Sequence, residues 1–336
     1  MTSVVTGPPK VTVVPPAQTP TGEVEVSTLR LSFSRVDTYA TCPLKFRFTY
    51  VDKLPSPPSP DLSWGSSLHS ALEAWWSQKL PEPPPVDVLL KALYDNWDDT
   101  GFEGMPREEK LKWYVHAQDV LRRHHERYRA RYVPAVACEQ WFELDLGDGV
   151  QVVGSIDHVA RTASGGIGIV DWKTNKRAKT RKQVAANLQL AIYVLAATEL
   201  WGHDPEWVAL DFVVPGVRVT VPRPEIDTEA AVRTLQAVAA HIRAETFEPS
   251  PSALCAWCDY RALCPAFEGD GPDVPGLAVV ELTRLRRRRE RDAARIVELE
   301  GLVRERLGPE VTVEFPAGEA GSGEPADKPD SADDLP

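Results

Sequence analysis

The sequence lacks any apolar run of the roughly 20 residues that a membrane-spanning helix needs. Its first ten residues lack the basic segment and apolar core of a secretory signal peptide. It also contains no G-x-x-x-x-G-K-[ST] motif, the phosphate-binding loop of P-loop nucleotide hydrolases. These absences predict a cytoplasmic protein with no membrane partner.

Cysteine is scarce, with five in the chain: Cys42, Cys138, Cys255, Cys258 and Cys264. An odd number in a cytoplasmic protein argues against a disulfide framework. Cys255 and Cys258 have the C-x₂-C spacing of metal ligands, and Cys264 follows closely. A fourth thiolate could come from Cys42 or Cys138, and four thiolates fit either tetrahedral zinc or an iron–sulfur cluster.

Basic residues are fewer than acidic ones, 38 against 49, which gives the chain a net charge of −11. The excess is uneven, because residues 308–336 carry −7 and the remaining 307 residues only −4. Local fields therefore say more about partners than the total charge does. Hydrophobic and charged contents of 43% and 26% are ordinary for a globular protein.

Two apolar runs at the centre of the chain predict a β-hairpin. Gln151–Ala160 and Gly166–Trp172 are joined by a short Gly-bearing turn. Each run carries an aspartate, Asp157 or Asp171, and Lys173 shares a strand face with Asp171. Two carboxylates suit Mg²⁺ or Mn²⁺, and a lysine beside them can hold a phosphate or a water. From these residues alone, a metal site and an ordinary surface ion pair are equally acceptable.

A basic segment follows the hairpin directly. Lys173–Lys182 contains six bases and no acid. A solvated loop would explain this composition. Its place after a candidate metal site favours a track for a phosphate backbone.

Hydrophobic periodicity predicts the remaining elements. Helices are expected over residues 31–39, 67–80, 86–98, 108–132, 184–201 and 228–245, and strands over 139–146, 207–214 and 217–221. This order indicates a mixed α/β sheet rather than a doubly wound parallel one. The helix 184–201 is expected to be strongly amphipathic, with Gln189 and Tyr193 on one face. The bases of 108–132 fit either a solvated face or a phosphate-contacting surface.

Composition divides the chain into four parts. Residues 1–28 form a leader rich in Pro, Thr and Val that is expected to be disordered, and 29–268 form the folded domain. Residues 269–308 are expected to form a linker and a charged helix over 281–307 with a partial heptad. Residues 309–336 are an acidic tail, also expected to be disordered.

Six motifs, taken in their order along the chain, resemble the RecB-type branch of the PD-(D/E)xK nuclease superfamily. More narrowly, they are similar to CRISPR-associated and phage-borne exonucleases that carry an iron–sulfur cluster. The resemblance covers residues 31–267 and implies a restriction-endonuclease-like core, a mixed central sheet flanked by helices, with an iron–sulfur staple and a C-terminal helix. The motifs are Leu31–Pro43, Gly65–His69, Gly154–Asp157, Asp171–Thr174, Gln189–Tyr193 and Cys255–Pro265.

The resemblance also implies roles for individual residues. Asp157 and Asp171 would bind Mg²⁺ or Mn²⁺, with His69 and the backbone carbonyl of Trp172 completing the metal site. Lys173 would position or activate the attacking water, so that the catalytic set is His69, Asp157, Asp171 and Lys173. The residues expected to contact DNA or to support the site are Gln189, Tyr193, Lys176, Arg177, Lys179, Arg181 and Lys182.

A 4Fe–4S cluster is the second cofactor that the resemblance implies. Its ligands would be Cys42, Cys255, Cys258 and Cys264, because the family takes the fourth cysteine from the N-terminal Cys-Pro segment. Cys138 would then be an ordinary buried cysteine.

The implied function is a metal-dependent DNA exonuclease that acts on single-stranded ends, in DNA recombination, repair or phage DNA metabolism. Its partners would be DNA and a helicase, recombination or CRISPR integrase protein, in the cytoplasm or in the host cytoplasm if phage-encoded. One alternative is a nuclease that processes ends for CRISPR adaptation. An alternative of another class is a non-catalytic, zinc-containing DNA-binding or adaptor protein.

Overall fold

The computed structural model of the chain describes residues 28–267, 289, 293–299, 301–302 and 305. The chain divides into two units, Glu25–Arg284 and the combination of Met1–Val24 with Leu285–Pro336. In the second unit, residues 293–299 are helical, in agreement with the predicted helix over 281–307. The leader up to residue 27 and the acidic tail lie outside the described residues. Within those residues, no helix has the length and apolar character needed to cross a membrane.

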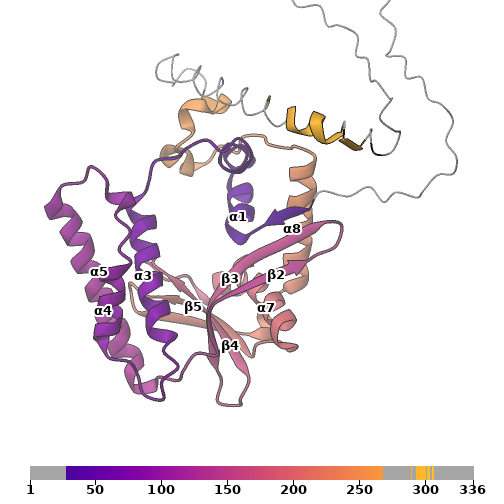
Figure 1. The fold of residues 1–336 in the computed structure, drawn as a ribbon. Coiled ribbons are helices and arrows are strands. Elements are labelled where there is room, and N and C mark those ends of the chain that lie inside the picture. Colours follow the sequence, from indigo (N-terminus) through magenta and orange to yellow (C-terminus); the bar gives the residue numbers. More distant parts are fainter. Residues whose placement is uncertain (1–27, 268–288, 290–292, 300, 303–304, 306–336) are drawn as a thin grey trace, which may run out of the picture. The chain divides into compact units, whose positions relative to one another are not determined.

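The unit Glu25–Arg284 contains runs of helices separated by runs of strands (Figure 1). Its helices are α1 (Phe33–Thr41), α2 (Pro43–Phe46), α3 (Pro60–Trp76), α4 (Val86–Asp95), α5 (Arg107–Tyr128), α6 (Arg181–Ala185), α7 (Leu188–Trp201) and α8 (Thr228–Arg243). Its strands are β1 (Leu29–Leu31), β2 (Ala137–Asp145), β3 (Val150–Arg161), β4 (Ile167–Lys173), β5 (Trp207–Phe212) and β6 (Val217–Pro222).

The described strands form one six-stranded mixed sheet. β2 pairs antiparallel with β3 along one edge. The other edge of β3 is shared by β1, parallel to Val150–Val152, and by β4, antiparallel to His158–Arg161. β5 runs parallel to β4, and β6 runs antiparallel to β5. The predicted hairpin and the predicted mixed sheet are therefore confirmed.

Two hydrophobic cores hold the helices against the sheet. On one face, α3, α4 and α5 pack with Leu68, Trp75 and Leu121 around Val170 and Trp172 of β4. On the other face, α1, α7 and α8 pack against β3, β4 and β5 (Figure 1). Because consecutive strand residues point to opposite faces, β4 contributes Ile169 to one core and Val170 to the other. A mixed sheet between two helical layers fits the restriction-endonuclease-like fold.

The expected bounds of two helices are wrong. α3 begins at Pro60, seven positions before the predicted start, because proline is tolerated at the first helical turn. The predicted helix 184–201 is two helices, α6 and α7, separated at Ala186 and Asn187. The Asn187 side chain accepts a hydrogen bond from the Leu190 N–H and caps α7.

Two further expectations about the sheet and its cover need correction. α7 is not strongly amphipathic, because most of its surface is buried from Leu190 to Val194 and again at Ala196 and Ala197. It is a core helix. β1 was not predicted, since its three residues are too short to show an alternating pattern.

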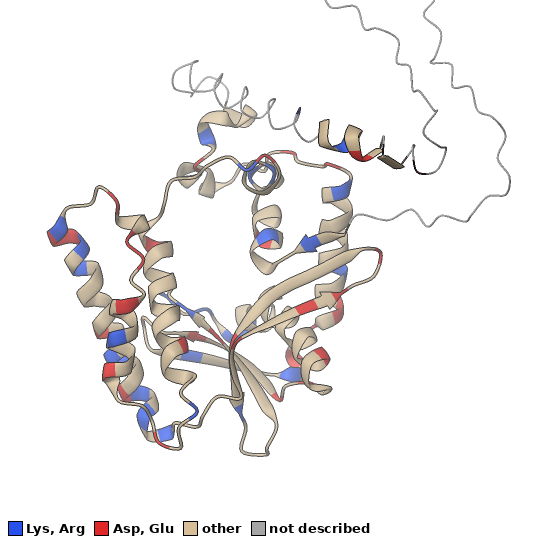
Figure 2. Cartoon of the chain, in the orientation of Figure 1, with Lys and Arg blue, Asp and Glu red and all other residues tan. Residues whose placement is uncertain are grey.

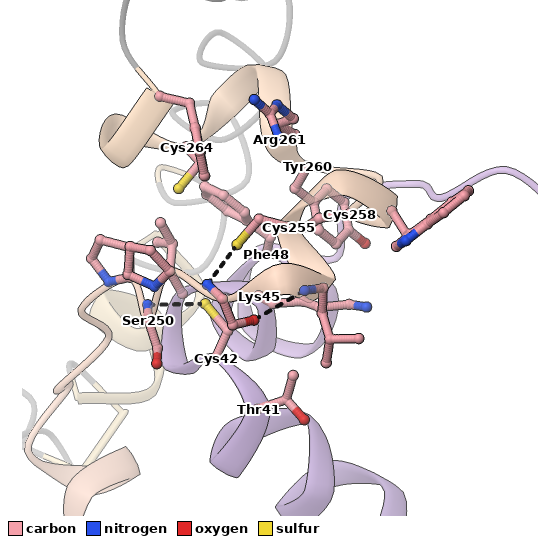
Figure 3. Close-up of a pocket in the computed structure, with 17 residues that line it drawn as sticks. Thr41, Cys42, Lys45, Phe48, Ser250, Cys255, Cys258, Tyr260, Arg261 and Cys264 are labelled. Atoms are coloured by element: carbon pink, nitrogen blue, oxygen red, sulfur yellow. Dashed lines mark hydrogen bonds between the residues drawn. The ribbon is translucent and has the colours of Figure 1, made fainter.

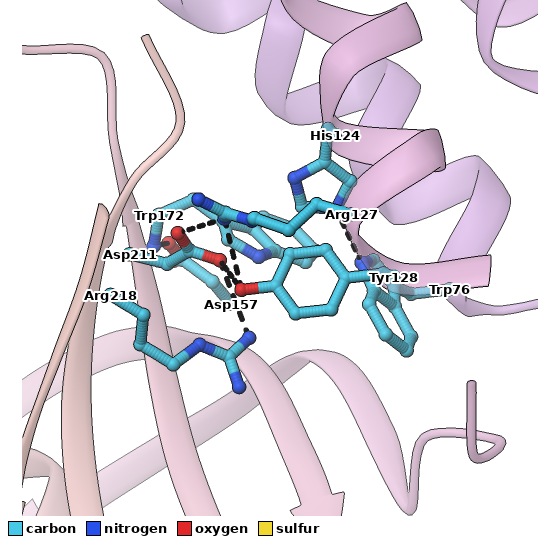
Figure 4. A network of polar contacts seen from close by, with 8 residues as sticks. All are labelled: Trp76, His124, Arg127, Tyr128, Asp157, Trp172, Asp211 and Arg218. Carbon is cyan, nitrogen blue, oxygen red and sulfur yellow. Dashed lines mark hydrogen bonds and ion pairs between the residues drawn. The ribbon is translucent and has the colours of Figure 1, made fainter. Parts of the chain in front are cut away.

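The basic helix α5 is partly buried, so its basic residues differ in their surroundings. Arg122 and Arg123 are exposed, and Lys and Arg alternate with Asp and Glu along its outer surface (Figure 2). Arg127 instead forms an ion pair with the fully buried Asp211 of β5 (Figure 4). Burial lowers the pKa of His124 to about 3, so that ring is neutral and accepts a hydrogen bond from Trp76.

Gly154 is required by packing rather than by backbone conformation. A Cβ at this position would lie 2.7 Å from Cζ of Phe142, whose ring is buried against β3. We expect Gly154→Ala to destabilise the fold by about 1–3 kcal/mol, the usual cost of overpacking a core. Thermal denaturation of the two proteins checks this.

The matched test is the double variant Gly154→Ala/Phe142→Leu. Removing the ring opens the space that the new methyl group needs, so the two substitutions should couple favourably. Strictly additive losses would show that the contact with Phe142 is not the cause.

Candidate active site

The candidate active site lies where β3 and β4 separate. Their ladder runs from Arg161–Ile167 to His158–Val170 and then stops. β4 continues through Asp171, Trp172 and Lys173 with β5 as its ladder partner. Asp157 and Asp171 would be the next pair in the register, so both carboxylates stand at the fork between the two strands.

Asp157 occupies the gap that the missing ladder pair leaves. Its Oδ2 accepts a hydrogen bond of 2.8 Å from the backbone N–H of Trp172. A side chain thereby replaces a strand partner and fixes the carboxylate at the fork. Asp157 and Asp171 are 7% and 1% exposed, which is far too buried for a solvated surface pair.

Glu139 joins the two aspartates from β2, and the sequence did not single it out. The β2–β3 register passes over Glu139 and Asp157, although the residues on either side are paired. Glu139 has a φ of +44°, an unusual and strained conformation for a residue other than glycine. The sequence did not mark Glu139 as a site residue, because both its unusual φ and its proximity to His69 and Asp157 arise only in the folded sheet.

His69 reaches the fork from α3. One ligand atom each from His69, Glu139 and Asp157 lie within 4.8 Å of one another. The Nδ1 atom of His69 is 3.7 Å from Oδ2 of Asp157, and its ring meets that of Trp172 edge to face at 5.9 Å. Gly65, one turn earlier, lets the helix approach, since a Cβ there would lie 3.3 Å from Oγ1 of Thr174.

The pKa values of the group favour a bound cation. Burial and then the charge of Asp171 raise the pKa of Asp157 well above its usual value. Burial lowers the pKa of His69, which keeps the ring neutral and able to ligate. A divalent ion would relieve the cost of placing Asp157, Asp171 and Glu139 together in a buried site.

Lys173 stands beside the carboxylates in a chain of polar contacts. Its Nζ lies 2.7 Å from Oδ2 of Asp171 and donates a hydrogen bond of 2.7 Å to Oε1 of Gln189. Gln189 in turn donates to the hydroxyl of Tyr193 at 2.8 Å. Tyr193 is buried, and burial raises the pKa of its hydroxyl. Of the two roles expected for Gln189 and Tyr193, this geometry fits support of Lys173.

Two adjoining pockets lead away from the fork and share Asp61 and Thr174. The inner one, of about 500 Å³, is lined by His69 and Glu139. The outer one, of about 720 Å³, is bordered by basic and aromatic residues. In the outer pocket the rings of Trp64 and His116 stack at 5.2 Å with 2° between their planes. Its other lining residues are Lys112, Trp113, Asn175, Lys176 and Arg177.

The predicted basic segment divides into residues beside this pocket and residues away from it. Lys176 and Arg177 line the outer pocket, and both are exposed. Lys179 and Lys182 are exposed without lining it. Arg181 forms an ion pair with Glu225 and donates to the carbonyl of Thr220.

Four of the five cysteines line a single pocket of about 180 Å³. Figure 3 shows Cys42 on the N-terminal segment and Cys255, Cys258 and Cys264 on the segment that ends the described domain. The Sγ of Cys42 accepts a hydrogen bond from the Ser250 N–H at 3.5 Å, and that of Cys255 one from the Ser252 N–H at 3.3 Å. Backbone donors of this kind stabilise thiolates.

Cys138 is separate from these four. It packs against the core between the sheet and α3 to α5, and burial raises the pKa of its thiol to about 11. It does not line the pocket that the other four share.

The chain belongs to the PD-(D/E)XK nuclease superfamily, whose model matches residues 30–265. Members of this superfamily are typically nucleases that use divalent metals such as Mg²⁺ or Mn²⁺. Among curated proteins, the chain is 26% identical to the Gene 69 protein of Mycobacterium phage D29, over 70% of this chain and 97% of that protein. It is 23% identical to the Gene 69 protein of Mycobacterium phage L5, over 70% and 96%. A solved structure, that of SSO0001, aligns at a TM-score of 0.37 with 16% identity, over 73% of this chain and 88% of that one.

Metal binding at the fork should depend on Asp157 and on pH. Since the folded pKa of Asp157 is raised, its protonation stabilises the metal-free fold at low pH, and this contribution is lost as the pH rises through that pKa. We expect Asp157→Asn to raise the metal-free Tm at pH 8 by about 2–4 °C. We also expect Mn²⁺ to raise the Tm of the parent protein and Asp157→Asn to abolish that increase.

Thermal melts with and without Mn²⁺ across pH 5–9 test both parts. The Mn²⁺ effect in the parent should grow with pH, because the metal binds the ionised carboxylate. Asp119→Asn, which removes an exposed carboxylate of α5, is the matched control. Undiminished stabilisation of Asp157→Asn by Mn²⁺ would rule out Asp157 as a ligand.

Proposed function

We propose that this chain is a divalent-metal-dependent deoxyribonuclease that degrades single-stranded DNA from an end, in recombination, repair or phage DNA metabolism. The observation that carries the proposal is the convergence of His69, Glu139, Asp157 and Asp171 at the fork, with Lys173 beside Asp171. Membership of the nuclease superfamily and the phage relatives support it.

The residues at the fork fit a divalent cation. His69, Glu139 and Asp157 would hold it, with Asp171 as a further carboxylate and the Trp172 carbonyl turned toward His69. These are the nitrogen and oxygen donors that Mg²⁺ and Mn²⁺ accept. Once bound, the ion would stabilise negative charge on the phosphate and lower the pKa of a water.

Lys173 would orient the attacking water or the scissile phosphate. Its ammonium group lies between Asp171 and Gln189, and two contacts of 2.7 Å fix the position of Nζ. Tyr193 holds Gln189 in turn. A cation held in this way meets developing charge without first having to reorganise.

The two adjoining pockets would guide the strand to the fork. The outer pocket combines unpaired cations, Lys176 and Arg177, with the stacked rings of Trp64 and His116. Bases that are not paired can stack on aromatic rings while the backbone follows the positive charge. This combination is why we propose a single strand rather than a duplex as the substrate.

We further propose that Cys42, Cys255, Cys258 and Cys264 hold a 4Fe–4S cluster. Their donor chemistry fits, because four thiols border one pocket and two of them accept backbone hydrogen bonds. Burial raises the pKa of Cys264, so binding must displace its proton. The cluster would be structural, since it would join segments more than 200 positions apart (208 between Cys42 and Ser250).

Substitutions at the fork should separate catalysis from folding. We expect Asp171→Ala and Lys173→Ala each to lower the rate of DNA hydrolysis by at least about 100-fold. Both should keep a cooperative thermal transition. Lys182→Ala, in the same basic segment but away from the pockets, should stay within about twofold of the parent.

The assay uses end-labelled single strands, the same strands in duplex, and circular single strands, each with Mn²⁺. An exonuclease for single strands consumes the first substrate, attacks the second slowly and spares the circle. Cutting of the circle would overturn the exonuclease assignment, and parent-like cleavage by both variants would overturn the site.

The cysteine assignment has an internal control in Cys138. In anaerobically purified protein, Cys42→Ala and Cys258→Ala should lose iron and acid-labile sulfide and melt several degrees lower than the parent. Cys138→Ala should keep the full content of both. A colourless parent that carries zinc would instead favour the zinc-containing DNA-binding or adaptor protein, and Cys42→Ala with its iron intact would refute the ligand set.

A further inference from the structure

A second basic pocket lies on the face of the sheet that α5 covers. It has a volume of about 460 Å³, and we call it the arginine pocket after four of its lining residues. None of the described residues that line it is acidic. The arginines come from three separate parts of the fold, α5 with the turn after it, the end of β3, and β6: Arg127, Arg131, Arg161 and Arg218.

Two of these arginines are held in place from behind by Asp211. Arg127 pairs with Oδ1 of Asp211 and donates to the hydroxyl of Tyr128 at 2.9 Å. Arg218 pairs with Oδ2 at 3.3 Å (Figure 4). The guanidinium carbons of Arg127, Arg131 and Arg218 lie 4.5, 4.8 and 4.8 Å from the centre of the Tyr128 ring.

The charge of this group is not balanced within the pocket. Asp211 pairs with two of the four guanidinium groups, so the positive charges that line the pocket outnumber the one carboxylate behind them. Like charges gathered around a cavity attract an anion and are stabilised by it. Arg131 and Arg161 are exposed, so both can be reached by such a ligand.

The fixed arginines also have donors to spare. Nε and Nη1 of Arg127 and Nε of Arg218 are buried and have no hydrogen-bond acceptor among the residues that the structure describes. Buried donors in native proteins are nearly always satisfied, so these N–H groups indicate a missing acceptor. Gly216 borders Arg127 closely, since a Cβ there would lie 3.4 Å from Nη1, and its φ of +68° suits glycine.

We propose that the arginine pocket binds a phosphate group, carried either by a mononucleotide or by a nucleic-acid strand. Guanidinium groups match the geometry of phosphate oxygens through paired N–H donors. The volume is that of a small-ligand site, and half-buried Trp207 offers an aromatic surface for a base. This site differs from the fork, because the arginine pocket and the pocket at the fork have no lining residue in common.

Titration calorimetry in EDTA tests the proposal on the full chain without requiring catalysis. The probes are inorganic phosphate, dAMP and a short oligothymidylate. The variant Arg131→Gln/Arg161→Gln removes two exposed charges from the pocket and leaves the ion pairs of Asp211 with Arg127 and Arg218 intact. Arg122→Gln/Arg123→Gln removes two exposed charges of α5 that do not line the pocket.

We expect the parent and the control to bind at least one probe with similar affinity. The pocket variant should lose about tenfold or more, with a shallower dependence on salt. Binding of phosphate and dAMP would identify a mononucleotide site, whereas binding of the oligonucleotide alone would identify a strand. No binding by the parent, or equal binding by the two variants, would overturn the proposal.

Discussion

The fork between β3 and β4 is the constraint on which the candidate site depends. A ladder that ended without replacement would leave a buried N–H at Trp172 unpaired, at a cost of about 1–3 kcal/mol. The carboxylate of Asp157 accepts that N–H and so serves as a structural element in addition to its proposed role as a metal ligand. Asp171, Lys173 and Trp172 take their places because β4 then follows β5 alone. The strained Glu139 closes the group from the neighbouring strand.

The sheet around this fork could be predicted to the extent that its signals are local. The hairpin, Asp157, Asp171 and Lys173 are readable because alternation and the turn lie within about twenty residues. Three other features could not be predicted, because each depends on contact with a residue distant in sequence. They are Glu139, Asp211 and the ring pair Trp64–His116. The prediction of one continuous helix over 184–201 failed for another reason. Apolar residues lie on both sides of Asn187, and the capping role of Asn187 is visible only from its hydrogen bond with the Leu190 N–H.

Three polar sites lie in separate parts of one domain and differ in their chemistry. Carboxylates collect at the fork, guanidinium groups on the α5 face, and thiols beyond the end of α1. The first two have no lining residue in common, although Asp157 at the fork and His158 in the arginine pocket are neighbours in β3. The third is independent of the sheet and is anchored by Tyr260, whose hydroxyl donates to the Leu54 carbonyl. Each site can therefore be altered with limited effect on the others.

The cysteine pocket also sets an order of events during synthesis. A ribosome delivers Cys42 early and Cys264 after nearly all of the described domain has emerged. The sheet, the fork and the arginine pocket are complete in sequence before the last thiol exists. Closing the cysteine pocket is thus the final step available to the nascent domain.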